Sequence, residues 1–467
     1  MSTSLPSHIQ TIPGNDLYSR RELLQRTGVG IGGLALAHLL DGNRLQAAQV
    51  PHFPPRAKHV SHLFMNGGPS HVDSFDPKPQ LEKYAGKRLP IHFRTERKTG
   101  VAFPTSFKFK PRGKSGLPVS DLFPHIGGCA DDICVIRSMH ANVPNHEPSL
   151  MLMNCGDDRM PRPSVGSWIS YGLGSENANL PTFLVLIPGG VPVRGPDNWR
   201  SAFLPASYQG VYVNTRVKQL NSIIPFLRNQ SLSLHDQRRQ LDFVNKLNRL
   251  RQERKQAESG DLDSRIRTFE LAYRMQTEAM EAFDIGRETQ SIRNMYGHNS
   301  YARQLIMARR LIERGVRYVQ VYSGNFQPWD QHNNLTKTHK HLARRHDQPI
   351  AALLKDLKQR GMLDETLVIW GGEFGRTPTT EGSDGRDHNH WGFSYWMSGG
   401  GVKGGMHYGA TDDFGWRAVE NRVHVHDLHA TILHLLGIDH TRLTYRYSGR
   451  DFRLTDVSGR VIREICV

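Results

Sequence analysis

Residues 367–378 read LVIWGGEFGRTP, a short apolar run that ends at two glycines, a glutamate and an arginine. Four consecutive apolar residues bounded by glycine predict a buried strand. Glu373 then stands at the exit of that strand, where a carboxylate is partly desolvated and needs a positive partner. A metal ion could supply that charge, and a simple salt bridge to Arg376 is the alternative. The segment therefore predicts a strand of a buried sheet and a candidate ligand at its end.

The same pattern of a strand followed by a polar loop recurs along the chain. Strands are expected at 60–65, 131–137, 180–188, 317–323, 367–370 and 393–399, and helical segments at 145–156, 215–315, 347–360 and 426–438. Strands separated by helices predict an α/β fold with a mixed, mostly parallel sheet and helices on both faces.

Four of the expected strand-exit loops carry carboxylates or imidazoles. In open α/β sheets, ligands bind beyond the carboxyl ends of the strands, where such loops meet. Oxygen and imidazole ligands without thiolates suit Zn, Mn, Mg or Ca. The loop residues are Asn66, Ser70, His71, Asp73 and Asp76; Asp330, Gln331, His332 and Asn333; Glu373 and Arg376; and Asp387, His388, His390 and Trp391. The sequence therefore predicts one divalent-metal site built from several loops.

Each of these motifs has a plainer interpretation when it is taken alone. The aspartate of Asp330-x-His332 could bond its own backbone in a turn. His388 and His390 could be two surface histidines. The metal hypothesis rests on the recurrence of the same chemistry at four strand ends.

Composition indicates a globular protein with anionic partners. The chain has 467 residues, 37% of them hydrophobic, and a formal charge of +16 from 60 Lys+Arg and 44 Asp+Glu. Such a charge favours nucleic acid, anionic polysaccharide, or phosphate and sulfate esters. The basic residues are dense at 238–255 and 303–317, where Glu and Gln interleave as on solvated helix faces. No nucleic-acid-binding signature is present, so nucleic acid is not expected as a partner.

The four cysteines lack metal-binding spacing and are too few for a disulfide scaffold. One disulfide is compatible with export.

The N-terminus predicts export. Residues 18–40, YSRRELLQRTGVGIGGLALAHLL, place Arg20 and Arg21 before a weakly apolar, glycine-rich stretch that is too short for a stable membrane span. This pattern resembles a twin-arginine signal, with an amphipathic N-terminal helix as the alternative. Residues 1–50 are thus expected to be signal and linker, and the mature protein to be periplasmic or secreted. No other apolar run approaches 18 residues, so no membrane span is expected after signal removal.

Three segments together resemble a known superfamily. LDETLVIWGGEFG (363–375), NHEPSLMLMNCG (145–156) and HVHDLHATILHLLGID (424–439) resemble segments of sulfatases and other alkaline phosphatase-like proteins, in the same order. With WDQHNN (329–334) and the twin-arginine start, the chain is most similar to the DUF1501 family. The resemblance implies an alkaline phosphatase-like domain over 58–467 with a helical insertion at about 215–300.

The resemblance also implies a two-metal site of the kind that stabilises attacking and leaving oxygens in ester hydrolysis. Asp330 and His332 resemble ligands of one metal, completed by His388 or His390. Glu373 stands at a position that binds the second metal. Two family positions differ: Phe374 replaces a histidine, and Asn66 replaces an aspartate, for which Asp73 or His71 would compensate.

The nucleophile position departs furthest from the sulfatase pattern. His146 stands where sulfatases carry the Cys or Ser that becomes formylglycine, and no C/S-x-P-x-R sequence exists elsewhere. The options are Ser149 or Ser70 as an alkoxide, His146 as an extra ligand or nucleophile, and attack by metal-bound water, which we favour. Arg376 is expected to hold an anionic ester oxygen.

These inferences predict an exported, metal-dependent hydrolase of phosphate or sulfate esters, for example those of a polysaccharide. The alternative is a catalytically degenerate member of the fold that serves as a binding or structural module. The sequence does not indicate an oligomeric state.

Overall fold

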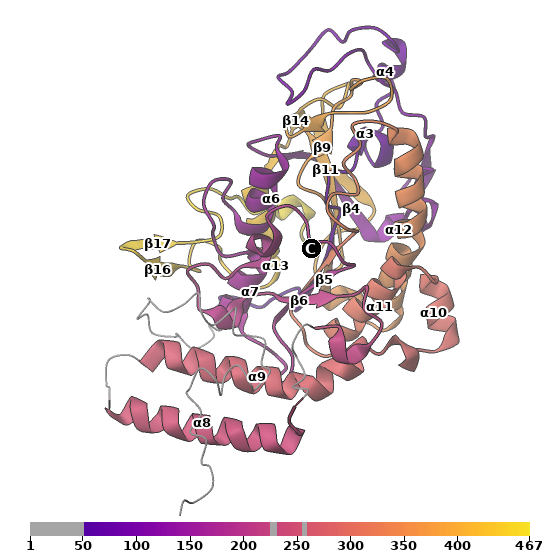
Figure 1. Ribbon diagram of the computed structural model, residues 1–467. Coiled ribbons are helices and arrows are strands. Elements are labelled where there is room, and N and C mark those ends of the chain that lie inside the picture. Colours follow the sequence, from indigo (N-terminus) through magenta and orange to yellow (C-terminus); the bar gives the residue numbers. More distant parts are fainter. Residues whose placement is uncertain (1–50, 225–230, 255–258) are drawn as a thin grey trace, which may run out of the picture.

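A nine-stranded sheet forms the centre of the protein (Figure 1). The computed structural model describes residues 51–224, 231–254 and 259–467, so the expected twin-arginine signal lies outside the described residues. The strand order is β12-β4-β11-β8-β1-β7-β5-β6, with β15 beside β4. The strands are β1 (His59–Phe64), β4 (Ile133–His140), β5 (Phe183–Ile187), β6 (Val211–Asn214), β7 (Tyr318–Tyr322), β8 (Thr366–Gly371), β11 (Phe393–Ser398), β12 (Met406–Tyr408) and β15 (Val423–His424).

All neighbouring strands of this sheet pair in parallel except at β11. The parallel pairs are β1 with β7 and β8, β5 with β6 and β7, and β4 with β12 and β15. Strand β11 runs antiparallel to both of its neighbours, β4 and β8. The predicted α/β class with a mixed, mostly parallel sheet is therefore confirmed.

Alternating side chains of the strands bury into two separate cores, one on each face of the sheet. In β8, Val368 and Trp370 join one core, and Leu367 and Ile369 join the other. This alternation follows from the two-residue period of a strand. A strand that is apolar at every position is therefore one covered on both faces.

Helices cover both faces, as predicted (Figure 1). The helices α6 (His146–Cys155), α7 (Val165–Leu173) and α13 (Val425–Leu435) lie on one face. The helices α10 (Gln290–Tyr296), α11 (Ser300–Ile312) and α12 (Leu335–Gln359) lie on the other. Within the described residues, no helix has both the length and the apolar character that crossing a bilayer requires.

Two long helices occupy the region of the expected insertion. Helix α8 (Leu234–Arg254) lies alongside α9 (Ser259–Phe283) at the bottom of Figure 1. Buried residues near the end of α9, among them Ala279 and Phe283, join the core beneath α11. Helix α8 is held to α9 by the ion pair of Arg238 with Glu270, whose closest N–O distance is 2.7 Å.

Shorter elements complete the chain. They are α3 (His71–Ser74), α4 (Gln80–Lys83), α5 (Pro124–Gly127), β2 (Phe109–Arg112), β3 (Leu117–Ser120), β9 (Gly375–Arg376), β10 (His388–Asn389), β13 (Ala410–Thr411), β14 (Ala418–Glu420), β16 (Tyr445–Tyr447) and β17 (Arg450–Phe452). The four cysteines are all within the described residues and are free thiols.

The start of α12 differs from the sequence expectation. The helix was expected from residue 347, but it begins at Leu335 and contains Pro349. Proline has no N–H, so the carbonyl of Arg345, four residues earlier, loses its helical partner. Asn299, the N-cap of α11, donates from Nδ2 to this carbonyl at 3.0 Å. Its Oδ1 accepts from the N–H groups of Tyr301 and Ala302, so one side chain satisfies both the start of α11 and an interior carbonyl of α12.

We therefore expect Asn299→Ala to lower the free energy of unfolding by about 2–3 kcal/mol, because it removes an N-cap and leaves a backbone carbonyl without a partner. Asn299→Asp keeps the cap but cannot donate to Arg345, so it should cost about half as much. Urea unfolding followed by circular dichroism measures both. Equal stability of the Ala and Asp variants would contradict the double role.

Candidate metal centre

Loops from four strands meet at one edge of the sheet. The carboxyl ends of β1, β4, β7 and β8 lie at this edge because these strands are parallel. Strand β11 is antiparallel to β8, so the loop that precedes β11 arrives at the same edge. The chain thereby brings together His146 after β4, Asp330 and His332 after β7, Glu373 after β8, and His388 before β11.

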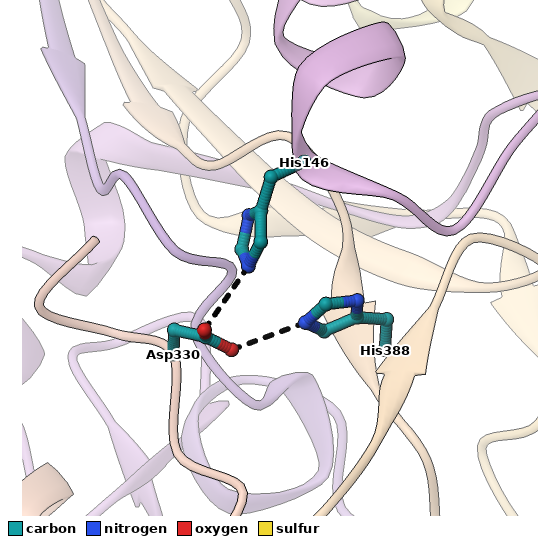
Figure 2. A group of neighbouring side chains, drawn as sticks. All are labelled: His146, Asp330 and His388. Carbon is teal, nitrogen blue, oxygen red and sulfur yellow. Dashed lines mark hydrogen bonds and ion pairs between the residues drawn. The ribbon is translucent and has the colours of Figure 1, made fainter. Parts of the chain in front are cut away.

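Three histidines direct their Nε2 atoms at the carboxylate of Asp330. The distance to an Asp330 oxygen is 3.2 Å from His146, 3.0 Å from His332 and 3.1 Å from His388. Figure 2 shows two of these contacts, those of His146 and His388. The contact of His388 with Asp330 is a hydrogen bond. The Nε2 atoms of His146 and His332 are buried and have no hydrogen-bond partner.

Each of the three histidines contacts a glutamate through its other ring nitrogen. His146 Nδ1 lies 2.7 Å from Glu373 Oε1, and His388 Nδ1 lies 2.6 Å from Glu96 Oε2. His332 Nδ1 contacts Glu381 in the same way. The result is a threefold arrangement in which Asp330 faces three imidazoles and a glutamate stands behind each of them.

Glu373 is fully buried and its carboxylate also accepts a backbone hydrogen bond. The N–H of Gly67 lies 3.0 Å from Oε1 and 3.1 Å from Oε2. Gly67 has a φ of +111°, and a Cβ there would lie 2.6 Å from the backbone nitrogen of Asp330. Only glycine fits this position, which therefore fixes the loop after β1 against the loop after β7.

The charges of the group shift its pKa values strongly. Burial lowers the pKa of His146, but the carboxylates of Asp330 and Glu373 outweigh it and raise the pKa to about 9. Burial raises the pKa of Asp330, yet the three histidines and Arg376 hold it far below its ordinary value. Burial also lowers the pKa of His332, and Asp330 and Glu381 raise it overall. Asp330 is therefore an anion that strongly favours positive neighbours.

Three overlapping sets of side chains have ligand atoms close enough to hold a metal ion. They are His146, Asp330 and His388; Glu96, Asp387 and His388; and His332, Glu381 and Asp387. Asp387 is fully buried, and its Oδ1 has no hydrogen-bond partner. None of the four cysteines, all of them described, belongs to these sets. Buried imidazole nitrogens and a carboxylate oxygen without hydrogen bonds, in the absence of thiolates, fit a divalent cation of the Zn or Mn type.

Asp330, His332, His388 and Glu373 thus come together as the sequence predicts, and His146 joins them as an additional candidate ligand. Two other predicted metal ligands lie elsewhere. His390 is buried against Trp391, with ring centroids 4.4 Å apart, and burial lowers its pKa to about 4. Asp73 accepts from Ser70 Oγ and pairs with Arg386 at 2.9 Å.

The predicted catalytic side chains Ser149 and Arg376 are engaged in structural contacts. Ser149 Oγ donates to the carbonyl of Val143 at 2.6 Å. Arg376 is fully buried and donates to the carbonyls of Gly67, Gly68 and Arg386 and, at 2.7 Å, to Asp330 Oδ1. This geometry places Arg376 beneath Asp330 as its supporting cation, a role different from the expected contact with an ester oxygen.

The two departures from the superfamily pattern have structural partners of their own. Asn66 donates to the carbonyls of Gly324 and Phe326 and accepts from Ser323. An aspartate could not donate to those carbonyls. Phe374 packs against the rings of His146 and His388, with centroids 4.9 Å and 4.4 Å away.

Glu96 and Glu381 are the residues that the site predictions missed, and Asp387 was named as a loop residue but not as a ligand. Asp387 directly precedes His388 in the DHNHWG segment, which is how the sequence brought it to attention. Glu381 lies in a turn after β9, and Glu96 lies in an irregular stretch without strand or helix. Neither follows a strand of the central sheet, and no pattern in the sequence distinguishes them from surface glutamates.

A family model confirms the resemblance to the DUF1501 family. The family described as "Protein of unknown function (DUF1501)" matches residues 57–466. No curated protein matches the chain.

Several solved structures are similar to the chain at low identity. The PsFucS1 sulfatase from Pseudoalteromonas sp. is 12% identical, with 89% of this chain and 72% of that chain covered and a TM-score of 0.35. The lipoteichoic acid synthase LtaP from Listeria monocytogenes is 9% identical, with 86% and 76% covered and a TM-score of 0.37. A magnesium-bound mutant of TAB5 alkaline phosphatase is 9% identical, with 74% and 92% covered and a TM-score of 0.31.

The partners of Asp73 generate a prediction that separates a structural aspartate from a ligand. We expect Asp73→Asn to lower the free energy of unfolding by about 3–5 kcal/mol at pH 7, because it leaves the buried charge of Arg386 without its partner. The same variant should bind as much metal as the unchanged protein. Urea unfolding and metal analysis check the two halves, and a loss of bound metal in a folded variant would contradict this assignment.

The pair also predicts a pH dependence. Burial raises the pKa of Asp73, but Arg386 and Ser70 outweigh it and bring the pKa below the ordinary value of 3.8. A lowered folded pKa adds stability that is present above the unfolded pKa and is lost as the pH falls through the folded value. The difference in stability between the unchanged protein and Asp73→Asn should therefore shrink below about pH 4.

Proposed function

Because the chain belongs to the DUF1501 family, whose description assigns no activity, we propose its function from the site: a divalent-metal-dependent hydrolase of phosphate or sulfate esters. The observation that carries the proposal is the convergence of three imidazole Nε2 atoms on Asp330 at the edge of the sheet. Such a set of side chains has no evident purpose in a structural module, since burying charges and leaving ring nitrogens unpaired both cost free energy.

The residues of the chain have distinct tasks in this proposal. The ion would be held by His146, Asp330 and either His388 or His332. It would supply charge stabilisation at the ester oxygens and activation of water. Arg376 keeps Asp330 ionised and oriented through its 2.7 Å contact. The side chain of Asp330 is 25% exposed and that of His146 is 13% exposed, so a substrate in solution can reach the group. Formylglycine chemistry is not part of the proposal, because His146 occupies its position.

Anionic esters are the substrate class that the charge of the protein favours. The formal charge of +16 attracts phosphate and sulfate groups. The resemblance of residues 363–375, 145–156 and 424–439 to sulfatase segments supports the same class. We also propose that the protein is exported by the twin-arginine route, on the basis of residues 18–40 alone.

We expect purified protein to contain divalent metal and to hydrolyse p-nitrophenyl phosphate or p-nitrophenyl sulfate in a metal series. Asp330→Ala should lower metal affinity by more than about 100-fold, beyond the effect typical of residues that only support a ligand, and abolish turnover. Asp364→Ala is the matched control, because Asp364 is exposed at the start of β8, at the opposite edge of the sheet.

Mass spectrometry of bound metal and a chromogenic assay measure these outcomes. Bound metal without turnover of either ester would favour the second function, a binding or structural module. Substoichiometric metal together with no turnover would refute the hydrolase.

The export proposal has a separate test. Replacing Arg20 and Arg21 by lysines should abolish accumulation outside the cytoplasm, because the arginine pair is what the twin-arginine route reads. Fractionation followed by immunoblotting measures it, with Arg26→Lys in the same segment as the control. Unchanged export of the double variant would refute this route.

A further inference from the structure

We propose that Arg97 is the residue that binds the anionic group of the substrate, and that a strap formed by residues 88–99 holds it at the centre. This inference rests on the proposed function and deepens it, because it assigns the cation that recognises the phosphate or sulfate group. That cation was expected to be Arg376, whose guanidinium is instead committed to Asp330 and to backbone carbonyls.

A cation that binds a substrate must be reachable from solvent, and Arg97 meets this condition where two other arginines of the region do not. Arg376 and Arg386 are both fully buried and pair with buried or half-buried aspartates. The side chain of Arg97 is 53% exposed. Its guanidinium donates from Nη1 to Glu381 Oε1 at 3.2 Å, and its other donors have no hydrogen-bond partner among the described residues. A planar fork of free donors matches the oxygens of a phosphate or sulfate group.

The strap that carries Arg97 is fastened at its two ends. The N–H of Ala102 donates to the carbonyl of Lys87 at 2.8 Å, and the carbonyl of Ala102 accepts from the N–H of Gly86 at 3.3 Å. Residues 88–99 contain no helix or strand, and their backbone makes no hydrogen bond to other backbone within the described part of the chain. Contacts that involve side chains must therefore fix the position of the strap.

Two consecutive residues of the strap bond directly to residues of the centre. The backbone N–H of Arg97 donates to Asp387 Oδ2 at 2.7 Å, and Glu96 Oε2 lies 2.6 Å from His388 Nδ1. The guanidinium of Arg97 reaches Glu381, which belongs to the same centre. Both the backbone and the side chain of Arg97 are therefore held beside the candidate ligands.

Aromatic contacts fix the middle of the strap. The ring of Phe93 packs against Trp391 and Trp416, with centroids 5.7 Å and 6.2 Å away. Trp391 Nε1 also donates to the carbonyl of Arg94 at 3.2 Å. A segment that is already held in place loses little further freedom when it binds a ligand, so its affinity for that ligand is higher.

The ion pair of Arg97 with Glu381 leaves the guanidinium available to a substrate. Exposed ion pairs contribute little to stability, because solvent screens them and both side chains must be ordered. A charged ester oxygen can bind to the free donors of the fork, or replace Glu381 as the partner of Nη1.

The test is the binding of inorganic phosphate and of inorganic sulfate to the full-length protein, measured by isothermal titration calorimetry. We expect the unchanged protein to bind at least one of these anions. Arg97→Ala should weaken that binding by about 10- to 100-fold, the range expected when a hydrogen bond between charged groups is lost. Arg97→Lys keeps the charge but not the fork, so it should recover part of the affinity.

Lys98→Ala is the matched control. Lys98 is exposed and follows Arg97 in the strap, so this variant removes the same charge at nearly the same place. Anion affinity should change by less than about twofold, as for a screened surface charge. An equal loss of affinity in the Arg97→Ala and Lys98→Ala variants would reveal a general effect of positive charge and would overturn the inference.

Two further measurements separate contact with the substrate from support of the centre. Folded Arg97→Ala should contain as much metal as the unchanged protein. For any ester that is hydrolysed, KM should rise in this variant while kcat changes less, because binding of the ester group is what is lost. A loss of bound metal would show that Arg97 acts only through Glu381, which would also overturn the inference.

Failure of this inference is distinct from failure of the proposed function. Binding of neither anion to the unchanged protein would overturn the inference, and so would unchanged anion affinity in Arg97→Ala. Weakened anion binding in Arg97→Ala, without hydrolysis of either ester by the unchanged protein, keeps the anion site and removes the hydrolase. Hydrolysis with an unchanged KM in Arg97→Ala keeps the hydrolase and removes the anion site.

Discussion

The carboxylate of Asp330 is the group on which the whole centre depends. It accepts a hydrogen bond from buried Arg376 at 2.7 Å. It also faces three imidazoles, that of His332 from its own loop and those of His146 and His388 from two other loops. Arg376 in turn donates to the carbonyls of Gly67 and Gly68, so it ties the loop after β1 to the loops after β7 and β8. Without Asp330, the fully buried guanidinium of Arg376 would lose the one carboxylate partner it has among the described residues, which is among the most costly defects a protein interior can have. The same contact that orients a candidate ligand therefore also holds the edge of the sheet together.

Much of the fold and part of the centre could be predicted from the sequence. Buried strands such as β8 are continuous apolar runs, and the residues that follow such runs must lie at one edge of a parallel sheet. That rule located Asp330, His332, Glu373 and His388. It could not separate Glu373 from Asp73, because both follow strands; what distinguishes them is the neighbour, His146 in one case and Arg386 in the other. Glu96 and Glu381 follow no central strand, so only the folded chain brings them to their histidines.

Helix α12 gives a further reason why prediction was incomplete. Proline inside a helical pattern usually marks a boundary, and the expected start at residue 347 lay close to Pro349. The side chain of Asn299 supplies the missing hydrogen bond from another helix. A tertiary contact of this kind overrides a local rule, and no pattern within α12 itself announces it. The substitutions at Asn66 and Phe374 are similar, since each looks like a lost functional residue until its partners in the folded protein are known.

The reversed direction of β11 has a consequence for how the chain reaches its native state. Because His388 arrives at the edge from that strand, its contact with Glu96 spans 292 residues, and the contact of His146 with Glu373 spans 227. Pairings of such large sequence separation carry a high entropic cost of closure and make folding slow. No fragment that lacks the C-terminal third of the chain can contain the complete set of ligands. Metal binding at full affinity, which the proposed function expects, would thus show that these long-range contacts have formed, and the centre would serve as an internal marker of complete folding.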